Sequence, residues 1–150
     1  PSVLFHKDGS LQILCRTRQG VISESWSTDK GQTWSPMKAT SLPNPNSGTD
    51  AVTLADGRQL LIYNHSTKEG EEPKGRNILN LAISDDGKEW KPFMTLENQP
   101  NESGYSYPAI IQSKDGMVHM TYTYDRKTVK YVVVEPPENA PIFPISYVEN

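Results

Sequence analysis

Arginine side chains at the ends of predicted strands are the residues of this chain best suited to chemistry. Arg16 and Arg18 close the apolar stretch 11–17, and Arg76 precedes the apolar stretch 78–83. A guanidinium group presents a planar fork of donors that matches a carboxylate bidentately. We therefore predict that arginines from neighbouring elements converge on one carboxylate-binding pocket. The alternative is that each lies on the surface, with its aliphatic stem against a sheet.

Other kinds of site lack the residue patterns that they require. The three histidines, His6, His65 and His119, are scattered without ligand spacing, so no metal site and no cofactor are predicted. There is also no Gly-rich phosphate loop, no Gly-x-Ser-x-Gly turn and no Cys/His pair at motif distance. Only His65, beside Asn64 at the exit of an apolar stretch, is placed near the candidate pocket. The single Cys15 is expected to be a buried reduced thiol on a strand.

Composition excludes several classes of partner. Fifteen basic and eighteen acidic side chains in 150 residues give a net charge of −3, so no global field would attract nucleic acid or an anionic membrane. No apolar run approaches the roughly twenty residues of a membrane-spanning helix. We expect a soluble globular chain that binds any acidic ligand locally, and its compartment stays open.

Three Asp-Gly pairs predict hairpin turns about fifty residues apart. They are Asp8-Gly9, Asp56-Gly57 and Asp115-Gly116, and each separates two β-prone apolar runs. Helical periodicity is almost absent, because Val, Ile, Thr and Tyr alternate with polar residues. We expect strands over 3–6, 11–17, 21–26, 34–40, 51–54, 59–64, 79–83, 90–96, 109–112, 117–124 and 129–134. The charged segment 68–74 is expected to be a surface loop.

A longer repeat joins the third and fourth strands of the first two groups. Residues 27–34 (STDKGQTW) are followed by a degraded copy, 83–90 (ISDDGKEW), in which Asp85 stands in the place of Asp29. The Asp carboxylate can accept backbone N–H bonds across a turn, Gly adopts a conformation that other residues resist, and Trp buries beneath the loop. We assign both Asp residues a structural role.

The repeats predict an all-β fold of about three four-stranded antiparallel blades of a β-propeller. The blades are placed at about 1–46, 47–103 and 104–150, the third without a regular fourth strand. Propellers typically close with four to eight blades. We therefore expect either a fragment of a larger propeller or self-association through the open blade edges.

The repeated turns resemble the Asp-box, or BNR repeat, of the sialidase (neuraminidase) superfamily, and the resemblance covers essentially the whole chain. Leu14-Cys15-Arg16 before the first box is similar to the stretch that supplies one arginine of the sialidase triad. Residues 76–85 (RNILNLAISD) are similar to the stretch that supplies another. Gly104-Tyr105-Ser106-Tyr107 resembles the segment that carries the tyrosine nucleophile. The chain is then expected to be the C-terminal half of a six-bladed sialidase propeller.

The resemblance implies a function and roles for individual residues. It implies hydrolysis of a terminal acidic sugar, with Tyr105 as the nucleophile and Arg16 and Arg76 holding the carboxylate. A neutral phenol can approach an anomeric carbon that bears a carboxylate, and tyrosine is the known exception to the two-carboxylate rule. Tyr107 is the second candidate for the nucleophile beside Tyr105. The alternative for each is a structural role, with the ring packed between blades and the hydroxyl on a carbonyl oxygen.

Further predicted contacts and departures belong to the same resemblance. The loop 43–50 is expected to bring Asp50 to sugar hydroxyls, unless its Asn and Asp residues serve turn chemistry alone. His65 and Tyr107 complete the substrate-binding set. The family's Glu base, first arginine and Asp acid/base are expected to precede Pro1. Two alternatives remain open: a non-catalytic carbohydrate-binding propeller, and a lyase or other glycosidase on the same fold.

Overall fold

The computed structural model describes residues 1–139 and 145–146, and every regular element in that part of the chain is a β-strand. The twelve strands are β1 (Ser2–Phe5), β2 (Leu11–Arg16), β3 (Val21–Ser27), β4 (Lys38–Pro43), β5 (Asp50–Thr53), β6 (Gln59–Tyr63), β7 (Leu79–Ser84), β8 (Lys91–Glu97), β9 (Tyr105–Gln112), β10 (Val118–Tyr124), β11 (Thr128–Val134) and β12 (Ile145–Ser146). The predicted all-β fold is confirmed.

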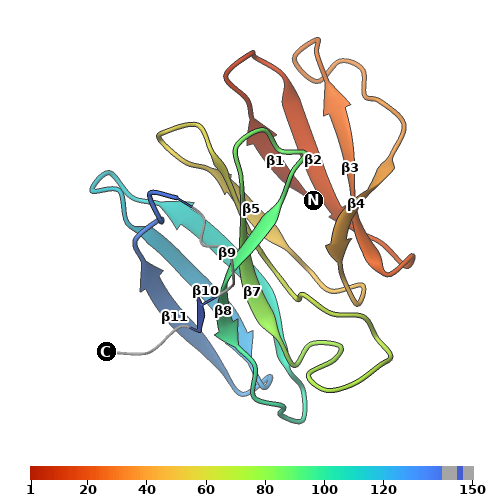
Figure 1. Ribbon diagram of the computed structural model, residues 1–150, viewed down its shortest axis with the longest axis vertical. Helices are drawn as coiled ribbons and strands as arrows, with labels where there is room; N and C mark the ends of the chain where they lie inside the picture. The colour runs from red at the N-terminus through yellow and green to blue at the C-terminus, as the bar shows by residue number, and fades with distance from the viewer. Residues whose placement is uncertain (140–144, 147–150) are drawn as a thin grey trace.

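The strands form three stacked sheets that follow one another along the chain (Figure 1). The first sheet is the meander β1-β2-β3-β4, the middle sheet contains β5-β6-β7-β8, and the third is β9-β10-β11. These strands pair antiparallel, whereas β12 adds to the middle sheet in parallel beside β8. By position in the chain, β12 belongs to the interval 104–150, yet it pairs with the middle sheet. Residues 140–144 and 147–150 of that interval lie outside the described residues.

Two hydrophobic cores hold the three sheets together. Leu4 and Leu14 of the first sheet pack against Leu61, Tyr63 and Ala82 of the middle sheet. On the other face of the middle sheet, a larger cluster joins it to the third; its members include Leu60, Ile62, Leu81, Phe93, Ile110, Met120 and Val132. Alternate side chains of β6 therefore enter different cores, which explains why four consecutive apolar residues, 60–63, follow Gln59 and why the strand is buried at every position.

The innermost strands β1, β5 and β9 lie beside one another, and the loops separate onto two ends of the stack. Ser2 of β1 pairs with Leu14, and Asp50 of β5 pairs with Ile62, so β1 and β5 start where β2 and β6 finish. We call this end, at the lower side of Figure 1, the entry end. All three Asp-Gly hairpins and both Asp-box turns lie at the opposite end.

The fourth strand of the first sheet begins later than predicted, at Lys38 rather than at Trp34. Residues 34–37 close the first Asp-box instead. The indole Nε1 of Trp34 donates to the Gly31 carbonyl at 3.1 Å, and the Ser35 N–H donates to the Trp26 carbonyl at 2.8 Å. These bonds bring the chain back to the edge of β3 before pairing with β4 starts.

The second Asp-box uses a different aspartate from the one predicted. In the first box, Ser27 Oγ donates to Asp29 Oδ1 at 2.8 Å and accepts the Gly31 N–H. In the second box, Ser84 occupies the place of that serine and donates to Asp86, not to Asp85. Asp86 also accepts the backbone N–H groups of residues 88 and 89. The second turn is one residue shorter between serine and tryptophan, so alignment on Gly and Trp selected the wrong carboxylate.

Candidate functional site

The sequence-predicted site residues all lie at the entry end. Arg16 is the last residue of β2, Asp50 is the first of β5, and Tyr105 is the first of β9. Arg76 and His65 belong to the loop between β6 and β7, which enters and leaves the middle sheet at this same end. The meander topology thus brings residues as distant in sequence as Arg16 and Tyr105 to one end of the stack.

Arg76 and Tyr107 are the two predicted residues that the structure places in direct contact. The guanidinium carbon of Arg76 lies 5.6 Å from the centroid of the Tyr107 ring, which is a cation–π arrangement. Arg76 is half-buried, whereas the Tyr107 side chain is 61% exposed. Among the described residues, no carboxylate forms an ion pair with Arg76. The pair therefore presents a positive charge and an accessible aromatic ring side by side.

Gly104 allows the chain to approach Arg76 this closely. The Tyr105 N–H donates to the Arg76 carbonyl oxygen at 2.8 Å. Gly104 has φ of 71°, and a Cβ atom added to it would lie 2.5 Å from Arg76 Cβ and 2.6 Å from the Arg76 carbonyl oxygen. No side chain fits in that space, so glycine is required both for its conformation and for its size.

An irregularity in β9 turns Tyr107 outward. Its φ is 53°, in the left-handed region that non-glycine residues rarely occupy. The pairing of β9 with β10 shifts register between Thr121 and Thr123, opposite this position. Tyr107 therefore does not follow its neighbours Tyr105 and Ser106 into the protein. Gly48 lies beside the ring, since a Cβ added there would be in van der Waals contact with it at 3.7 Å.

Tyr105 occupies the opposite environment. Its side chain is fully buried, and its hydroxyl donates to the Gln99 carbonyl at 2.6 Å. The ring packs edge-on against Tyr122 and Tyr124, with centroid separations of 6.4 and 5.2 Å. Burial, together with the nearby Glu97 carboxylate, raises the pKa of Tyr105 to about 12. Both effects favour the neutral phenol and oppose the phenolate that a nucleophile requires.

Asp50 links the innermost strands to one another. Its Oδ1 accepts a hydrogen bond from Ser2 Oγ at 2.9 Å, and its Oδ2 accepts one from the Ile110 N–H at 3.0 Å. Ser2 belongs to β1 and Ile110 to β9, so the half-buried carboxylate joins all three sheets near the stack axis. Each carboxylate oxygen keeps further lone pairs for a ligand.

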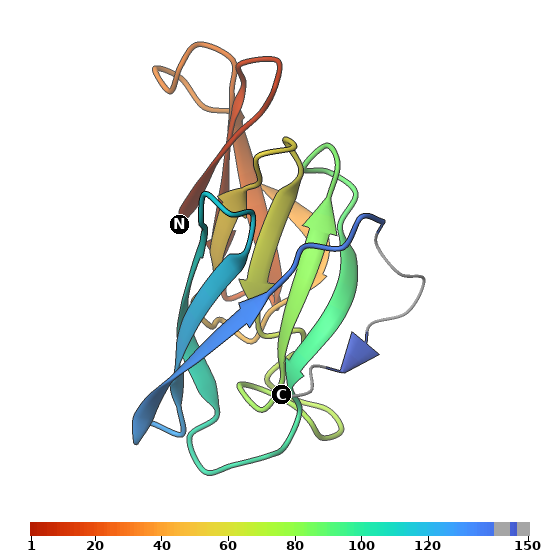
Figure 2. The ribbon, with the colours of Figure 1, turned by 90° about the vertical axis from the view of Figure 1, so that its left-hand side faces the viewer.

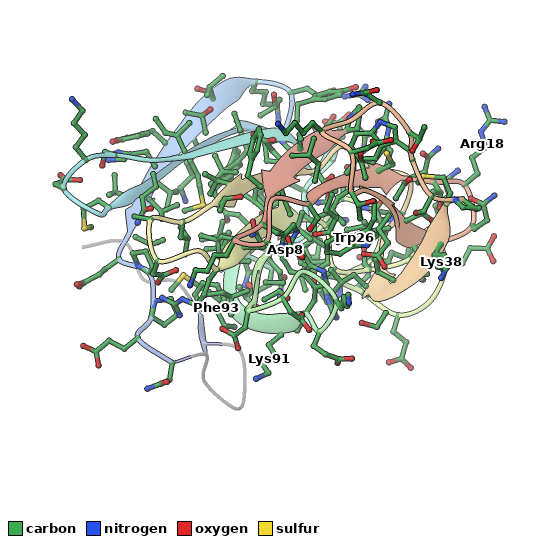
Figure 3. All side chains as sticks on the ribbon, turned by 90° about the horizontal axis from the view of Figure 1, so that it is seen from above. Asp8, Arg18, Trp26, Lys38, Lys91 and Phe93 are labelled. Carbon is green, nitrogen blue, oxygen red and sulfur yellow. The ribbon has the colours of Figure 1, made fainter. Side chains whose placement is uncertain are left out.

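Arg16 and His65 lie at the same end without joining the Arg76–Tyr107 pair. Within the described part of the chain, Arg16 is exposed and no hydrogen bond, ion pair or ring contact connects it to Arg76. His65 is half-buried, and its Nδ1 forms a short hydrogen bond with the Tyr63 hydroxyl. Burial lowers the pKa of His65 and so favours the neutral imidazole. Arg18 extends from the first sheet away from the ribbon (Figure 3).

Asn64 organises this end of the molecule, and the sequence had not singled it out for that role. Fully buried, it donates through Nδ2 to the carbonyls of Ile78 at 2.8 Å and Tyr105 at 3.1 Å. It therefore fixes the two segments that carry Arg76 and Tyr107. Two buried oxygen atoms at this end, Asn64 Oδ1 and Ser106 Oγ, have no hydrogen-bond partner among the described residues. The feature of the sequence that indicates this role is an asparagine directly after the apolar residues of β6, because asparagine side chains often hydrogen-bond backbone groups where a strand ends.

Two kinds of feature are absent from residues 1–139 and 145–146. No group of His, Cys, Asp or Glu side chains is arranged to hold a metal ion. No helix there has the length and apolar character needed to cross a membrane.

These observations define an all-β protein of the propeller class, with blade-like antiparallel sheets and a polar end at the innermost strands. The chain belongs to the BNR repeat-like domain family, whose model matches residues 1–120. Among curated proteins, none matches the chain.

Solved structures with the same arrangement include two intramolecular trans-sialidases. The enzyme from Ruminococcus gnavus, in complex with oseltamivir carboxylate, superposes with a TM-score of 0.68 at 23% identity, over 89% of this chain and 32% of that one. The leech enzyme, complexed with 2,7-anhydro-Neu5Ac, gives 0.68 at 21% identity, over 89% and 23%. The α-L-arabinofuranosidase Arb93A from Fusarium graminearum gives 0.59 at 15% identity, over 95% and 49%. At these identities the likeness establishes the fold.

The chain spans a third or less of the length of the two trans-sialidases. Its three sheets match part of sialidase propellers, as the sequence predicted for the fold.

Proposed function

We propose that the entry end binds a terminal acidic sugar of a glycan, as part of a sialidase-type carbohydrate-active propeller. The observation that carries the proposal is the Arg76–Tyr107 pair. A half-buried guanidinium without an ion-pair partner among the described residues lies against an aromatic ring that is 61% exposed. The fold shared with trans-sialidases supports the same class of ligand.

The chemistry of the pair suits a carboxylated sugar. The guanidinium can donate two parallel hydrogen bonds to a carboxylate, and partial burial strengthens them relative to water. The apolar face of a pyranose ring can pack on an exposed tyrosine, as aromatic side chains bury large areas at binding sites. Arg16 and the free lone pairs of Asp50 are placed in the same pocket by this proposal, as contacts to the carboxylate and to a hydroxyl. His65 is assigned to its rim.

For hydrolysis, Tyr107 is the better placed tyrosine. An attacking phenol oxygen must reach the anomeric carbon, and the Tyr105 hydroxyl is buried against the Gln99 carbonyl. Tyr107 is accessible, and its ring lies beside the Arg76 guanidinium that would hold the substrate carboxylate. The finer proposal is therefore an exo-sialidase in which Tyr107 attacks and Tyr105 supports the strand that carries it. A proton donor for the leaving oxygen is a further requirement of this reaction.

Binding is tested by titrating the protein with N-acetylneuraminic acid, and with galactose as the neutral comparison, by calorimetry or NMR. Arg76→Ala should weaken binding of the acid by about 10- to 100-fold, because a charge-assisted hydrogen bond contributes roughly 1.5–3 kcal/mol. Arg76→Lys should restore only part of it. Lys114→Ala, an exposed charge at the opposite end, is the matched control and should bind normally. Equal binding by wild type and Arg76→Ala would remove the proposal.

Turnover is tested separately with a fluorogenic sialoside, a uronic-acid glycan and an arabinofuranoside. Loss of sialoside hydrolysis in Tyr107→Phe, with binding retained, supports Tyr107 as the nucleophile. Loss in Tyr105→Phe with full activity in Tyr107→Phe would reverse that assignment. Binding without turnover of any substrate supports the non-catalytic carbohydrate-binding propeller, and turnover of another substrate alone supports a different glycosidase or lyase.

A further inference from the structure

The middle sheet is buried on both faces, whereas each outer sheet uses only one. Every residue of β6 and β7 is buried, because one face of this sheet packs on the first sheet and the other on the third. In the first sheet, Leu4 and Leu14 point to the middle sheet. In the third, Ile110, Met120 and Val132 do so. Each outer sheet therefore has a face with no described sheet against it.

The free face of the first sheet is apolar and carries no charge. Its members follow from the strand register, in which Val3 pairs with Ile13 and Phe5 with Leu11. Phe5 is 63% exposed and Val3 46% exposed. Cys15 continues the same row on β2 and is half-exposed. We call Val3, Phe5, Leu11, Ile13 and Cys15 the first outer face.

The free face of the third sheet has the same character. Register places Ile111 beside His119, Ala109 beside Thr121, and Val129 beside Thr123. Ile111, Val129 and Tyr131 are 61%, 66% and 58% exposed. We call the face formed by Ala109, Ile111, Thr121, Val129, Tyr131 and Val133 the third outer face. His119 lies within it, with its Nδ1 hydrogen-bonded to the Tyr131 hydroxyl at 2.6 Å. Figure 2 looks onto this sheet, and no described segment crosses it.

Neither face contains Asp, Glu, Lys or Arg, although these residues make up 22% of the sequence. A sheet face that meets water normally alternates its apolar residues with charged or polar ones. Contiguous exposed apolar surface of this kind marks a protein contact. The absence of charge also argues against a nucleic acid or an anionic surface as the occupant, since such partners require a basic one.

We propose that the two outer faces bind each other between two copies of this chain. Inside one copy, sheets pack in one repeating relation, first on middle and middle on third, with β1 beside β5 and β5 beside β9. One more step of that relation places a first outer face on a third outer face, and β1 of the partner copy beside β9. Two copies make this contact twice and close a ring of six sheets, within the four to eight blades that propellers use. Each copy contributes one first outer face and one third outer face, so every outer face in the dimer has a partner.

Mass measurement across a range of concentrations tests the ring directly. Light scattering coupled to size-exclusion chromatography of the 150-residue chain should give twice its 16.8 kDa mass, without growth beyond the dimer. A monomer throughout the micromolar range overturns the proposal, because both outer faces would then remain in contact with water. A concentration-dependent series of larger species overturns the closed ring.

Charge substitutions then locate the contact. Ile111→Lys on the third outer face and Phe5→Lys on the first should each raise the dimer dissociation constant by about 100-fold, because a buried unpaired charge is costly. Met37→Lys is the matched control, since Met37 is 49% exposed in the loop before β4 and belongs to neither face. All three positions are exposed within one copy, so the variants should keep the circular dichroism spectrum of the wild type. A dimer of unchanged strength in Ile111→Lys overturns the proposal.

The native Cys15 gives an independent readout of the same contact. It is the only cysteine and lies on the first outer face, so a partner copy should cover it. Its rate of labelling by a thiol reagent should fall as the protein concentration rises. In Ile111→Lys, which changes a residue on the third outer face, Cys15 should label at the fast rate at every concentration. A labelling rate independent of concentration in the wild type contradicts the ring. None of these measurements depends on glycan binding.

Discussion

At the scale of single residues, two tyrosines separated by one serine have opposite surroundings. The left-handed backbone at Tyr107 turns its ring outward beside Arg76, whereas Tyr105 stays in the core with its hydroxyl on a carbonyl oxygen. A motif comparison cannot separate the two, because both sit in one Gly-Tyr-Ser-Tyr segment. The two tyrosines differ because the pairing of β9 with β10 shifts register opposite Tyr107. In the sequence, only Pro108, which follows Tyr107, indicates an irregular strand at this point.

Replacing each tyrosine by phenylalanine should therefore affect stability differently. Tyr105→Phe removes the hydrogen bond that the fully buried Tyr105 side chain donates to the Gln99 carbonyl, so the free energy of unfolding should fall by about 1 kcal/mol. Tyr107→Phe removes a hydroxyl on an exposed side chain and should change it by less than about 0.5 kcal/mol. Urea denaturation followed by circular dichroism measures both. Equal losses would mean that the two environments are alike.

The raised pKa of Tyr105 predicts a dependence on alkaline pH. Its folded pKa of about 12 exceeds the ordinary value of 10.0, so folding favours the protonated phenol. This stabilisation is complete below pH 10 and is lost as pH rises through 12, because the unfolded chain ionises first. The stability difference between wild type and Tyr105→Phe should thus shrink between pH 10 and 12. A difference that stays constant over this interval contradicts the buried position.

At the scale of elements, the Asp-box turns are held by ionised carboxylates. Hydrogen bonds from Thr33 and Ser27 lower the pKa of Asp29 to about 2, from an ordinary 3.8. Since the folded pKa is depressed, the stabilisation is present above pH 3.8 and is lost as pH falls towards 2. Asp29→Asn should lower the melting temperature at pH 6, and its deficit relative to wild type should vanish as pH approaches 2.

The second box offers a matched pair for the same effect. Asp86 accepts the hydrogen bonds of the turn, and backbone N–H groups lower its pKa, whereas its neighbour Asp85 forms no side-chain hydrogen bond within the described part of the chain. Asp86→Asn should therefore lower the melting temperature at pH 6, and Asp85→Asn should leave it unchanged. The reverse result would restore the assignment made from Gly and Trp spacing alone.

Gly104 couples the loop before β9 to the arginine of the proposed site. In Gly104→Ala, the new Cβ would overlap Arg76 and the residue would keep a positive φ, so we expect a loss of roughly 2–4 kcal/mol and weaker binding of acidic sugar. Gly75→Ala is the control, because Gly75 also has positive φ, 55°, but nothing lies within 4 Å of an added Cβ. A similar loss in both variants would show that conformation alone, and not the contact with Arg76, requires glycine.

The elements themselves could be predicted from sequence, and the details of their ends could not. Period-two alternation and Asp-Gly pairs identified eleven of the observed strands, since these signals are local. The start of β4 and the choice between Asp85 and Asp86 depend on which hydroxyl or N–H a side chain reaches after folding. For the site, the shared end of Arg16, Arg76 and Tyr105 followed from strand order. The burial of Tyr105 and the role of Asn64 depend on packing between sheets.

At the scale of the whole molecule, the middle sheet makes the stack one cooperative unit. Both cores contain its side chains, so removing it would expose the inner faces of both outer sheets. Repeat proteins in which each unit touches only its neighbours can unfold in stages. Here the same two strands, β6 and β7, contribute side chains to both cores, because adjacent residues of each strand belong to different cores. Local damage to this sheet should therefore destabilise the first and third sheets together.

Leu81→Ala tests this cooperativity. Leu81 is fully buried on β7 between the middle and third sheets, and its truncation should cost about 2–5 kcal/mol. Trp90 lies next to β8 of the middle sheet, so the comparison is made in a Trp90→Phe background. The remaining Trp26 and Trp34 then report on the first sheet, whose core does not contain Leu81, while circular dichroism reports on all strands. At one fixed protein concentration, which keeps any association constant, both signals should shift to the same lower urea midpoint. Met37→Ala, at a 49% exposed position that belongs to neither outer face, should stay within about 0.5 kcal/mol of wild type. A tryptophan midpoint that does not move in Leu81→Ala would mean that the first sheet unfolds independently of the other two.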